Sequence, residues 1–199
     1  MQLLRELRAG DSETEIRALV QALAEADGDT YRHSLEVAAT ATVLGRRLGL
    51  GRTELVEVEL GALLHDVGKL RLPPELLSKP GPLTEDEVRL VRLHPEWGSA
   101  MVASIPGLEA VAVIVMLHHE RPDGLGYPHG LALDRIPLAT RIVSVCDAFG
   151  AMTKRRPYSA PLDLEAALGE LERNRGTQFD AGVVDALVDF VRLPEQVPA

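Results

Sequence analysis

The sequence predicts an all-α fold in a single domain of seven or more helices. Its 199 residues suffice for one domain with a sizeable core. Aromatic residues make up only 4%, so that core must be built mainly from Leu, Val, Ala and Ile, and abundant Leu and Ala favour helix. No segment shows persuasive strand alternation. Val111–Val115 could form a strand on propensity alone, but its continuity with Met116–His119 favours a helix.

Periodicity and helix-end signals place the elements along the chain. Capping-box patterns beginning at Ser12 and at Thr84 each open a helix. The Gly49-Leu50-Gly51 turn separates the second helix from the third. Four prolines between Arg71 and Pro82 predict a loop with one short helix after Pro74. The predicted longer helices cover residues 12–26, 30–48, 53–66, 84–103, 107–119, 137–153, 161–174 and 180–192.

Charge and cysteine content exclude several classes of function. A net charge of −9 argues against a broad basic surface for nucleic acid. An anionic substrate would therefore need positive charge concentrated locally, by metals and a few Lys or Arg side chains. The single cysteine, Cys146, excludes an intrachain disulfide and a cysteine-based zinc finger, and we expect it to be a small core residue.

The chain offers no signal for a membrane. Residues 1–11 are charged and lack the long apolar core of a signal peptide. The longest apolar run, Ala110–Leu117, is too short to span a bilayer. We therefore expect a cytoplasmic protein.

The histidines gather with carboxylates at the ends of apolar segments. His65-Asp66 follows one apolar helix, His118-His119 follows another, and Asp147 lies in a mostly apolar stretch. Imidazole nitrogens and carboxylate oxygens bind divalent transition metals. Because neighbouring helix residues point about 100° apart, one member of a pair can hold one ion while the other reaches a second.

Each of these residues also has a structural interpretation. Asp66 could be a solvated carboxylate at a helix end, with Gly68 as the helix C-cap. His33 and the mid-helix His94 could be exposed polar residues, and Asp147 could cap another helix. No single motif decides between these alternatives.

The order and spacing of the motifs together closely resemble the HD-GYP domain, a branch of the HD phosphohydrolase superfamily. The resemblance spans about residues 29–190. It rests on His33, His65-Asp66-Val-Gly-Lys69, His94-Pro, His118-His119-Glu-Arg-Pro-Asp123-Gly-Leu-Gly-Tyr-Pro128 and Asp147, and extends to Lys79-Pro-Gly-Pro-Leu-Thr, Arg141-Ile-Val-Ser-Val-Cys-Asp147, Arg156-Pro-Tyr158 and Gly176-Thr-Gln-Phe-Asp180.

The resemblance implies an all-α cytoplasmic phosphodiesterase that hydrolyses cyclic di-GMP to linear pGpG, GMP or both. The nucleophile would be a hydroxide that bridges two cations. Two transition-metal ions are expected, iron or manganese first, with zinc and nickel as alternatives. The implied ligands are His33, His65, Asp66, His94, His118, His119 and Asp147, with Asp66 as the bridge.

The resemblance also implies contacts to the substrate. Lys69, taken as catalytic together with Asp66, could hold a phosphate oxygen; its alternative is a surface lysine. Arg156 matches a family position that contacts the nucleotide. Tyr127 could stack on a base or pin its loop. Asp123 could make hydrogen bonds to ligand histidines, and Gly126, like Gly124, allows a tight backbone path. The remaining histidine, His129, is interpreted as a loop residue.

The chain departs from the family pattern at two positions. Ser159 stands where relatives often carry Arg or Lys, so one positive contact to the substrate is missing. Asp29 stands where some members carry a Glu that supports a third metal. We interpret Asp29 as the N-cap before Thr30, and we expect no third metal there.

The domain prediction is an N-terminal helical extension over 1–28 and an HD-GYP catalytic domain over 29–192. The extension could pack on the core or mediate a homodimer, and the Gly-Tyr-Pro loop could bind protein partners. Two rival functions stay open: a metal phosphohydrolase acting on another cyclic dinucleotide, and a non-catalytic binding module. The sequence does not indicate how activity is regulated.

Overall fold

The computed structural model describes residues 11–154 and 161–192, and the regular structure in these ranges is helical. Instead of strands, the described residues contain two isolated bridges, Asp123 with Ala132 and Arg175 with Phe179. The predicted all-α fold is confirmed. The helices are α1 (Asp11–Ala26), α2 (Gly28–Arg47), α3 (Arg52–Leu64), α4 (Pro74–Leu77), α5 (Glu85–Val91), α6 (His94–Ala103), α7 (Glu109–Leu117), α8 (Leu138–Thr153), α9 (Leu164–Arg173) and α10 (Ala181–Arg192), with short 3-10 turns η2 (Val67–Arg71) and η3 (Leu133–Arg135).

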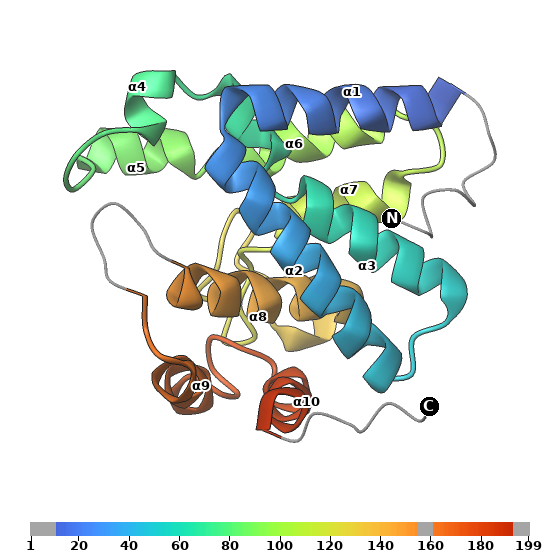
Figure 1. The fold of residues 1–199 in the computed structure, drawn as a ribbon, viewed down its shortest axis with the longest axis vertical. Helices are drawn as coiled ribbons and strands as arrows, with labels where there is room; N and C mark the ends of the chain where they lie inside the picture. Colours follow the sequence, from blue (N-terminus) through green and yellow to red (C-terminus); the bar gives the residue numbers. More distant parts are fainter. Residues whose placement is uncertain (1–10, 155–160, 193–199) are drawn as a thin grey trace.

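The helices surround two apolar clusters that meet at α3. Helix α1 lies at one end of the molecule and α9 and α10 at the other, with α2 crossing α8 between them (Figure 1). One cluster joins α2, α8, α9 and α10, and α3 contributes Val58 and Ala62 to it. The other joins α1, α6 and α7, and receives Leu60 and Leu64 from α3. Because α3 packs in both clusters, its C-terminal end, which precedes His65, lies where the two clusters meet.

The predicted helix over 84–103 is two helices, and this corrects the expected place of His94. Pro95 has no N–H to donate and its ring clashes with the carbonyl four residues earlier, so a helix cannot continue through it. Helix α5 therefore ends at Val91, and His94 begins α6 instead of lying mid-helix. The Thr84 capping box is confirmed: Thr84 Oγ1 accepts from Glu87 N at 3.3 Å.

Three other predictions about helix ends are wrong. Ser12 lies inside the first turn of α1, and its hydroxyl donates to the carbonyl of Pro106 at 3.3 Å. The N-cap of α2 is Asp27, which accepts from the N–H groups of Asp29 and Thr30; Asp29 pairs with Arg32 instead. Gly68 is not a C-cap, because α3 ends at Leu64 and Gly68 lies in η2.

Other elements agree with the sequence. The short helix after Pro74 is α4, Gly49 has a φ of 81°, and Cys146 is buried. Helix α1 contributes Ile16 and Leu23 to the buried residues. Within the described ranges, no helix combines the length and the apolar character that crossing a membrane requires.

Candidate metal centre

Three histidines at helix ends are held by the same type of hydrogen bond. His65 and His118 are the C-caps of α3 and α7, and His94 follows the end of α5. The Nδ1–H of each ring donates to the carbonyl three residues earlier: Ala62 at 2.7 Å, Val91 at 2.7 Å and Val115 at 2.8 Å. The last carbonyls of a helix lack intrahelical partners, so these bonds satisfy them. Each bond uses Nδ1, so that Nε2 of the ring faces the site and can bind a metal in its deprotonated form.

The first group of potential ligands comprises His33, His65 and Asp147, whose ligand atoms all lie within 4.8 Å of one another. Nε2 of His33 lies 2.7 Å from Asp147 Oδ1, and Nε2 of His65 lies 3.7 Å from the same oxygen. His33 comes from α2 and Asp147 from α8. A Cβ at Gly150 would be 3.1 Å from the His33 ring, so the glycine makes room for it.

The second group comprises His94, His118 and His119, again within 4.8 Å of one another. Nε2 of His94 lies 3.2 Å from Nε2 of His118. The hydroxyl of Ser144, on α8, donates to the backbone carbonyl of His118 at 2.6 Å. This bond attaches the end of α7 to the helix that carries Asp147.

Asp66 lies between the two groups. Its Oδ2 is 3.2 Å from Nε2 of His65, and its Oδ1 is 3.3 Å from Nε2 of His94. Lys69 also pairs with Oδ2, at 2.7 Å. The carboxylate is therefore placed as a bridge between the groups would be.

Two glycines, Gly68 and Gly98, allow the segment that carries Asp66 to come close to the helix that begins with His94. A Cβ at Gly68 would be 1.9 Å from the His94 carbonyl oxygen, and one at Gly98 would be 3.0 Å from Gly68 N. The backbones of η2 and α6 are thus in direct contact. Gly68 serves close packing beside Asp66, which is a different task from the C-cap expected of it.

The charges of the site are set by burial and by near neighbours. Burial raises the pKa of the Asp66 carboxyl, but Lys69 and His65 lower it more, so the pKa falls well below its usual range. Burial likewise raises the pKa of Asp147, and the His33 hydrogen bond and the charge of His65 outweigh it and lower the pKa. Burial lowers the pKa of His65, but Asp66 and Asp147 raise it to about 9.

In the second group, the pKa values of the histidines are lowered. Burial lowers the pKa of His94, His118 and His119, that of His119 to about 4. Two carboxylates and a set of neutral imidazoles thus face one another. His65 Nε2 and His33 Nδ1 are buried without a hydrogen-bond partner among the described residues. This nitrogen and oxygen donor set fits divalent transition metals.

The Gly-Tyr-Pro loop closes over the second group. The Tyr127 ring stacks on His119 with centroids 4.7 Å apart, and the Arg92 guanidinium carbon lies 5.0 Å from the centroid of the Tyr127 ring. Burial raises the pKa of Tyr127. A Cβ at Gly126 would be 2.5 Å from Arg121 N, and Gly124 has a φ of 75°, so the predicted tight backbone path is confirmed.

The role expected of Asp123 is corrected. Among the described residues its carboxylate bonds only within its own loop, to the guanidinium of Arg121 at 3.0 and 2.5 Å and to Leu125 N at 3.0 Å. It therefore does not orient a ligand histidine. The side chain of His129 is exposed, as expected of a loop residue. Arg156 and Ser159 lie outside the described residues.

Sequence reasoning missed Glu120. It is only 3% exposed, and its two carboxylate oxygens accept from His129 N at 2.6 Å and from Leu131 N at 2.9 Å. The available signal was a carboxylate placed directly after an apolar helix and the pair His118-His119. Its partners are backbone groups nine and eleven residues further along the chain, which no side-chain motif reveals.

Comparison with known proteins identifies the family. A family model described as HD domain matches residues 15–183. The chain belongs to the HD domain family. Its HD domain is similar to the cyclic di-GMP phosphodiesterase response regulator RpfG of Xanthomonas campestris, at 38% identity over 93% of this chain and 49% of the relative. A cyclic di-GMP phosphodiesterase of Thermotoga maritima is 36% identical over 92% of this chain and 50% of the relative.

Two further similarities widen the range of substrates named for relatives. The 3'3'-cGAMP-specific phosphodiesterase 3 of Vibrio cholerae is 35% identical over 82% of this chain and 36% of the relative. A solved structure of a cyclic GMP-AMP-specific phosphodiesterase of V. cholerae has a TM-score of 0.71 at 20% identity, over 92% of this chain and 49% of that one. The HD-domain chain thus spans about half the length, or less, of these relatives.

Proposed function

We propose that this HD domain is a metal-dependent phosphodiesterase that hydrolyses cyclic di-GMP to pGpG, GMP or both. The observation that carries the proposal is Asp66, which turns one oxygen to each of two ligand groups. The relatives at 38% and 36% identity, both named as cyclic di-GMP phosphodiesterases, support the substrate class.

The proposed site holds two transition-metal ions, iron or manganese first. One would lie among His33, His65 and Asp147, and the other among His94, His118 and His119, with Asp66 shared. When bound, two such ions supply an acidified water as nucleophile and polarise the phosphodiester. Asp29 is exposed and pairs with Arg32, and we assign it no ligand role.

The other residues serve the substrate. Lys69 places an ammonium group 2.7 Å from Asp66, where it can hold a phosphate oxygen beside the ions. Such a charge-assisted contact compensates the phosphodiester charge that an acidic chain would otherwise repel. Arg156 is proposed, on the family resemblance alone, as a second cation for the nucleotide.

A second substrate is favoured by one specific observation. The V. cholerae relative named as cGAMP-specific is 35% identical, almost as similar as the cyclic di-GMP enzymes. We therefore keep 3'3'-cGAMP as the alternative substrate for the same reaction.

One experiment tests the proposal. The purified protein is loaded with Mn²⁺ or with Fe²⁺ without oxygen, and incubated with cyclic di-GMP, 3'3'-cGAMP and cyclic di-AMP in parallel. Chromatography then identifies linear dinucleotides and mononucleotides. We expect cyclic di-GMP to be consumed fastest and metal-free protein to be inactive. Faster turnover of 3'3'-cGAMP would favour the alternative, and no turnover of any substrate would contradict the enzyme assignment.

A further inference from the structure

His119 is held differently from the other three histidines that follow helix ends. The rings of His65, His94 and His118 each donate to a backbone carbonyl through Nδ1. Among the described residues, the His119 ring shows no such bond. Its ring is instead stacked on Tyr127, with an interplanar angle of 23°. Tyr127 therefore helps to orient this ring, whose centroid also lies 4.0 Å from that of the His118 ring and 5.0 Å from that of the His94 ring.

Tyr127 is itself held against the backbone next to His119. Its N–H donates to the His119 carbonyl at 3.2 Å. The preceding Gly126 packs against the backbone of residues 119–121, where a Cβ would come within 2.6 Å of three backbone atoms. The Arg92 guanidinium carbon also lies 5.0 Å from the centroid of the Tyr127 ring. The place of Tyr127 thus depends on the path of the loop from Glu120 to Leu131.

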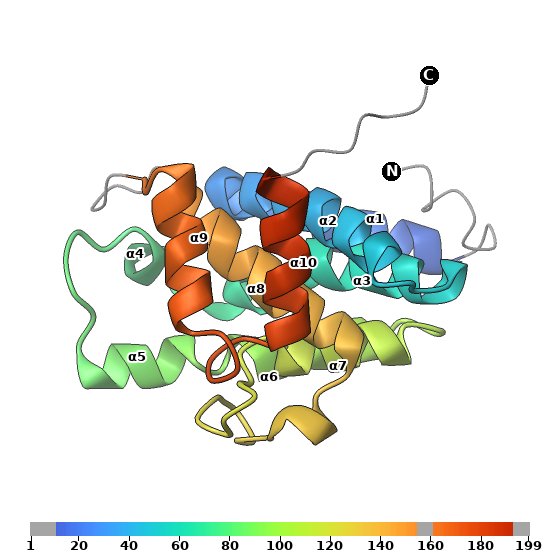
Figure 2. The same ribbon diagram turned by 90° about the horizontal axis from the view of Figure 1, so that it is seen from below.

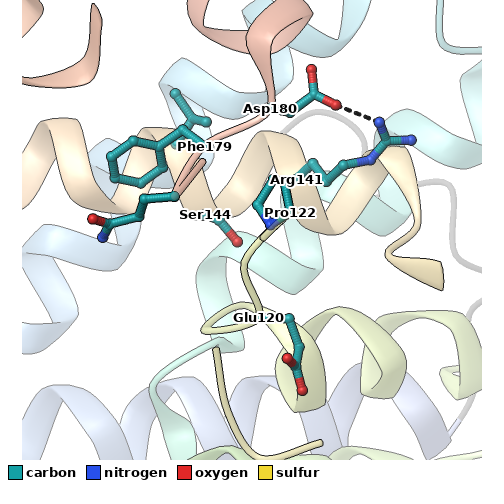
Figure 3. A pocket seen from close by; sticks show the side chains of 8 residues that line it. Glu120, Pro122, Arg141, Ser144, Phe179 and Asp180 are labelled. Carbon is teal, nitrogen blue, oxygen red and sulfur yellow. Dashed lines mark hydrogen bonds and ion pairs between the residues drawn. The ribbon is translucent and has the colours of Figure 1, made fainter. Parts of the chain in front are cut away.

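Glu120 closes that loop. Both hydrogen bonds to its carboxylate come from backbone N–H groups on the far side of Tyr127, those of His129 and Leu131. Figure 3 shows the carboxylate of Glu120 pointing away from Arg141, whose guanidinium pairs with Asp180 instead. A buried carboxylate that accepts two backbone hydrogen bonds holds the two ends of the loop together firmly, because hydrogen bonds to a charged acceptor are about twice as strong as neutral ones.

We infer that Glu120 is a positioning residue for the second ligand group. By closing the loop it holds Tyr127 on His119, and so sets the place of the His119 ring beside His94 and His118. This inference rests on the proposed function, because the proposed function assigns His94, His118 and His119 to one ion. Figure 2 shows the loop, in yellow, on the side of α6 and α7 that faces away from α2, so the loop acts on this group from one side only.

The test compares the two ion sites in Glu120→Gln. The amide keeps the shape of the side chain but turns one acceptor into a donor that faces a backbone N–H. Calorimetric titration of metal-free protein with Mn²⁺ should show one ion bound about 10- to 100-fold more weakly, as is typical of groups behind a metal ligand, and the other unchanged. Glu109→Gln is the control, because Glu109 is exposed at the opposite end of α7. It should leave both affinities unchanged.

A double substitution separates positioning from a general effect on folding. If Glu120 acts through Tyr127, Tyr127→Ala should weaken the same ion, and Glu120→Gln combined with Tyr127→Ala should be no weaker than the worse single variant. Tyr127→Phe keeps the stacking ring and should bind both ions normally. Far-ultraviolet circular dichroism establishes that each variant is folded. Limited trypsin digestion should cut Glu120→Gln faster than the parent after Arg135, which is followed by Ile136.

The outcomes are distinct. Normal titration of both ions in Glu120→Gln and in Tyr127→Ala would overturn the inference, as would equal weakening of both ions or losses that simply add. If the parent binds two ions but hydrolyses no dinucleotide, the proposed function fails while the positioning role stands. A parent that binds no ion would overturn both.

Discussion

Asp66 Oδ1 lies 3.3 Å from Nε2 of His94, although Asp66 follows α3 and His94 begins α6. The other oxygen of the same carboxylate faces His65 at 3.2 Å. A single side chain therefore connects two clusters that are otherwise built from separate helices. The first prediction follows from this placement.

Asp66→Asn should weaken both ions at once. The amide keeps the size of the side chain but removes the negative charge and one of the two oxygens, so the two ligand groups no longer share an anionic ligand. We expect activity to fall by far more than the 10- to 100-fold typical of residues behind the ligands. Metal content by elemental analysis and turnover by chromatography measure the effect. Asp86→Asn, a change at an exposed carboxylate paired with Arg89, is the control; an Asp66→Asn protein with its full metal content would refute the bridge.

Lys69→Met should separate substrate binding from metal binding. The substitution keeps a long side chain but removes the charge beside Asp66, and Lys is not among the ligands. Both ions should therefore stay bound. A hydrogen bond to a charged group contributes about 1.5–3 kcal/mol, so kcat/KM should fall roughly 10- to 150-fold. Turnover equal to that of the parent would show that Lys69 does not contact the substrate.

The sequence predicts most of the fold because helix formation is largely local. Apolar periodicity and the Thr84 capping box act within a few residues, and the corresponding helices are present. The break before His94 also has a local cause, Pro95, but the prediction extended the helix that opens at Thr84 through this proline. The N-cap of α2 shows the limit: Asp27 and Asp29 are equally good capping residues, and only the backbone decides between them.

Some residues of the site could be predicted from the sequence and others could not, for a related reason. Adjacent pairs such as His65-Asp66 can be recognised from spacing, since helix geometry separates neighbouring side chains. The contact that brings Asp66 to His94 depends on Gly68 and Gly98, which touch only after the chain has folded. Glu120 was missed because its partners are backbone N–H groups, and Asp123 was assigned a role that its exposed place in the loop does not allow.

Gly68→Ala tests whether close packing of η2 on α6 supports the site. The new methyl group would lie 1.9 Å from the His94 carbonyl oxygen and 2.6 Å from Gly98 N, so backbone must move. Overpacking of this kind typically costs about 1–3 kcal/mol. It should also move Asp66 from His94 and weaken metal binding. Urea unfolding and Mn²⁺ titration measure the two effects.

A matched glycine provides the control for that substitution. Gly28 opens α2, and a Cβ there would have nothing within 4 Å. Gly28→Ala should leave metal binding unchanged and raise the free energy of unfolding by about 0.4–1 kcal/mol, because alanine restricts the unfolded chain. If Gly68→Ala behaved like Gly28→Ala, the backbone contact between η2 and α6 would not be what places Asp66.

Metal removal should destabilise the whole domain, because the proposed ligands join α2, α3, α6, α8 and the end of α7. Without ions, His65 Nε2 and His33 Nδ1 are buried without a hydrogen-bond partner among the described residues, and such groups are costly. Mn²⁺ at 100 times its Kd should raise the free energy of unfolding by about 2.7 kcal/mol per site, provided that it does not bind the unfolded chain. Thermal unfolding with EDTA and with increasing Mn²⁺ measures the shift in Tm.

In His33→Ala the dependence of Tm on Mn²⁺ should shrink to that of one ion, because only the first group loses a ligand. A Tm independent of Mn²⁺ in the parent would contradict the metal centre.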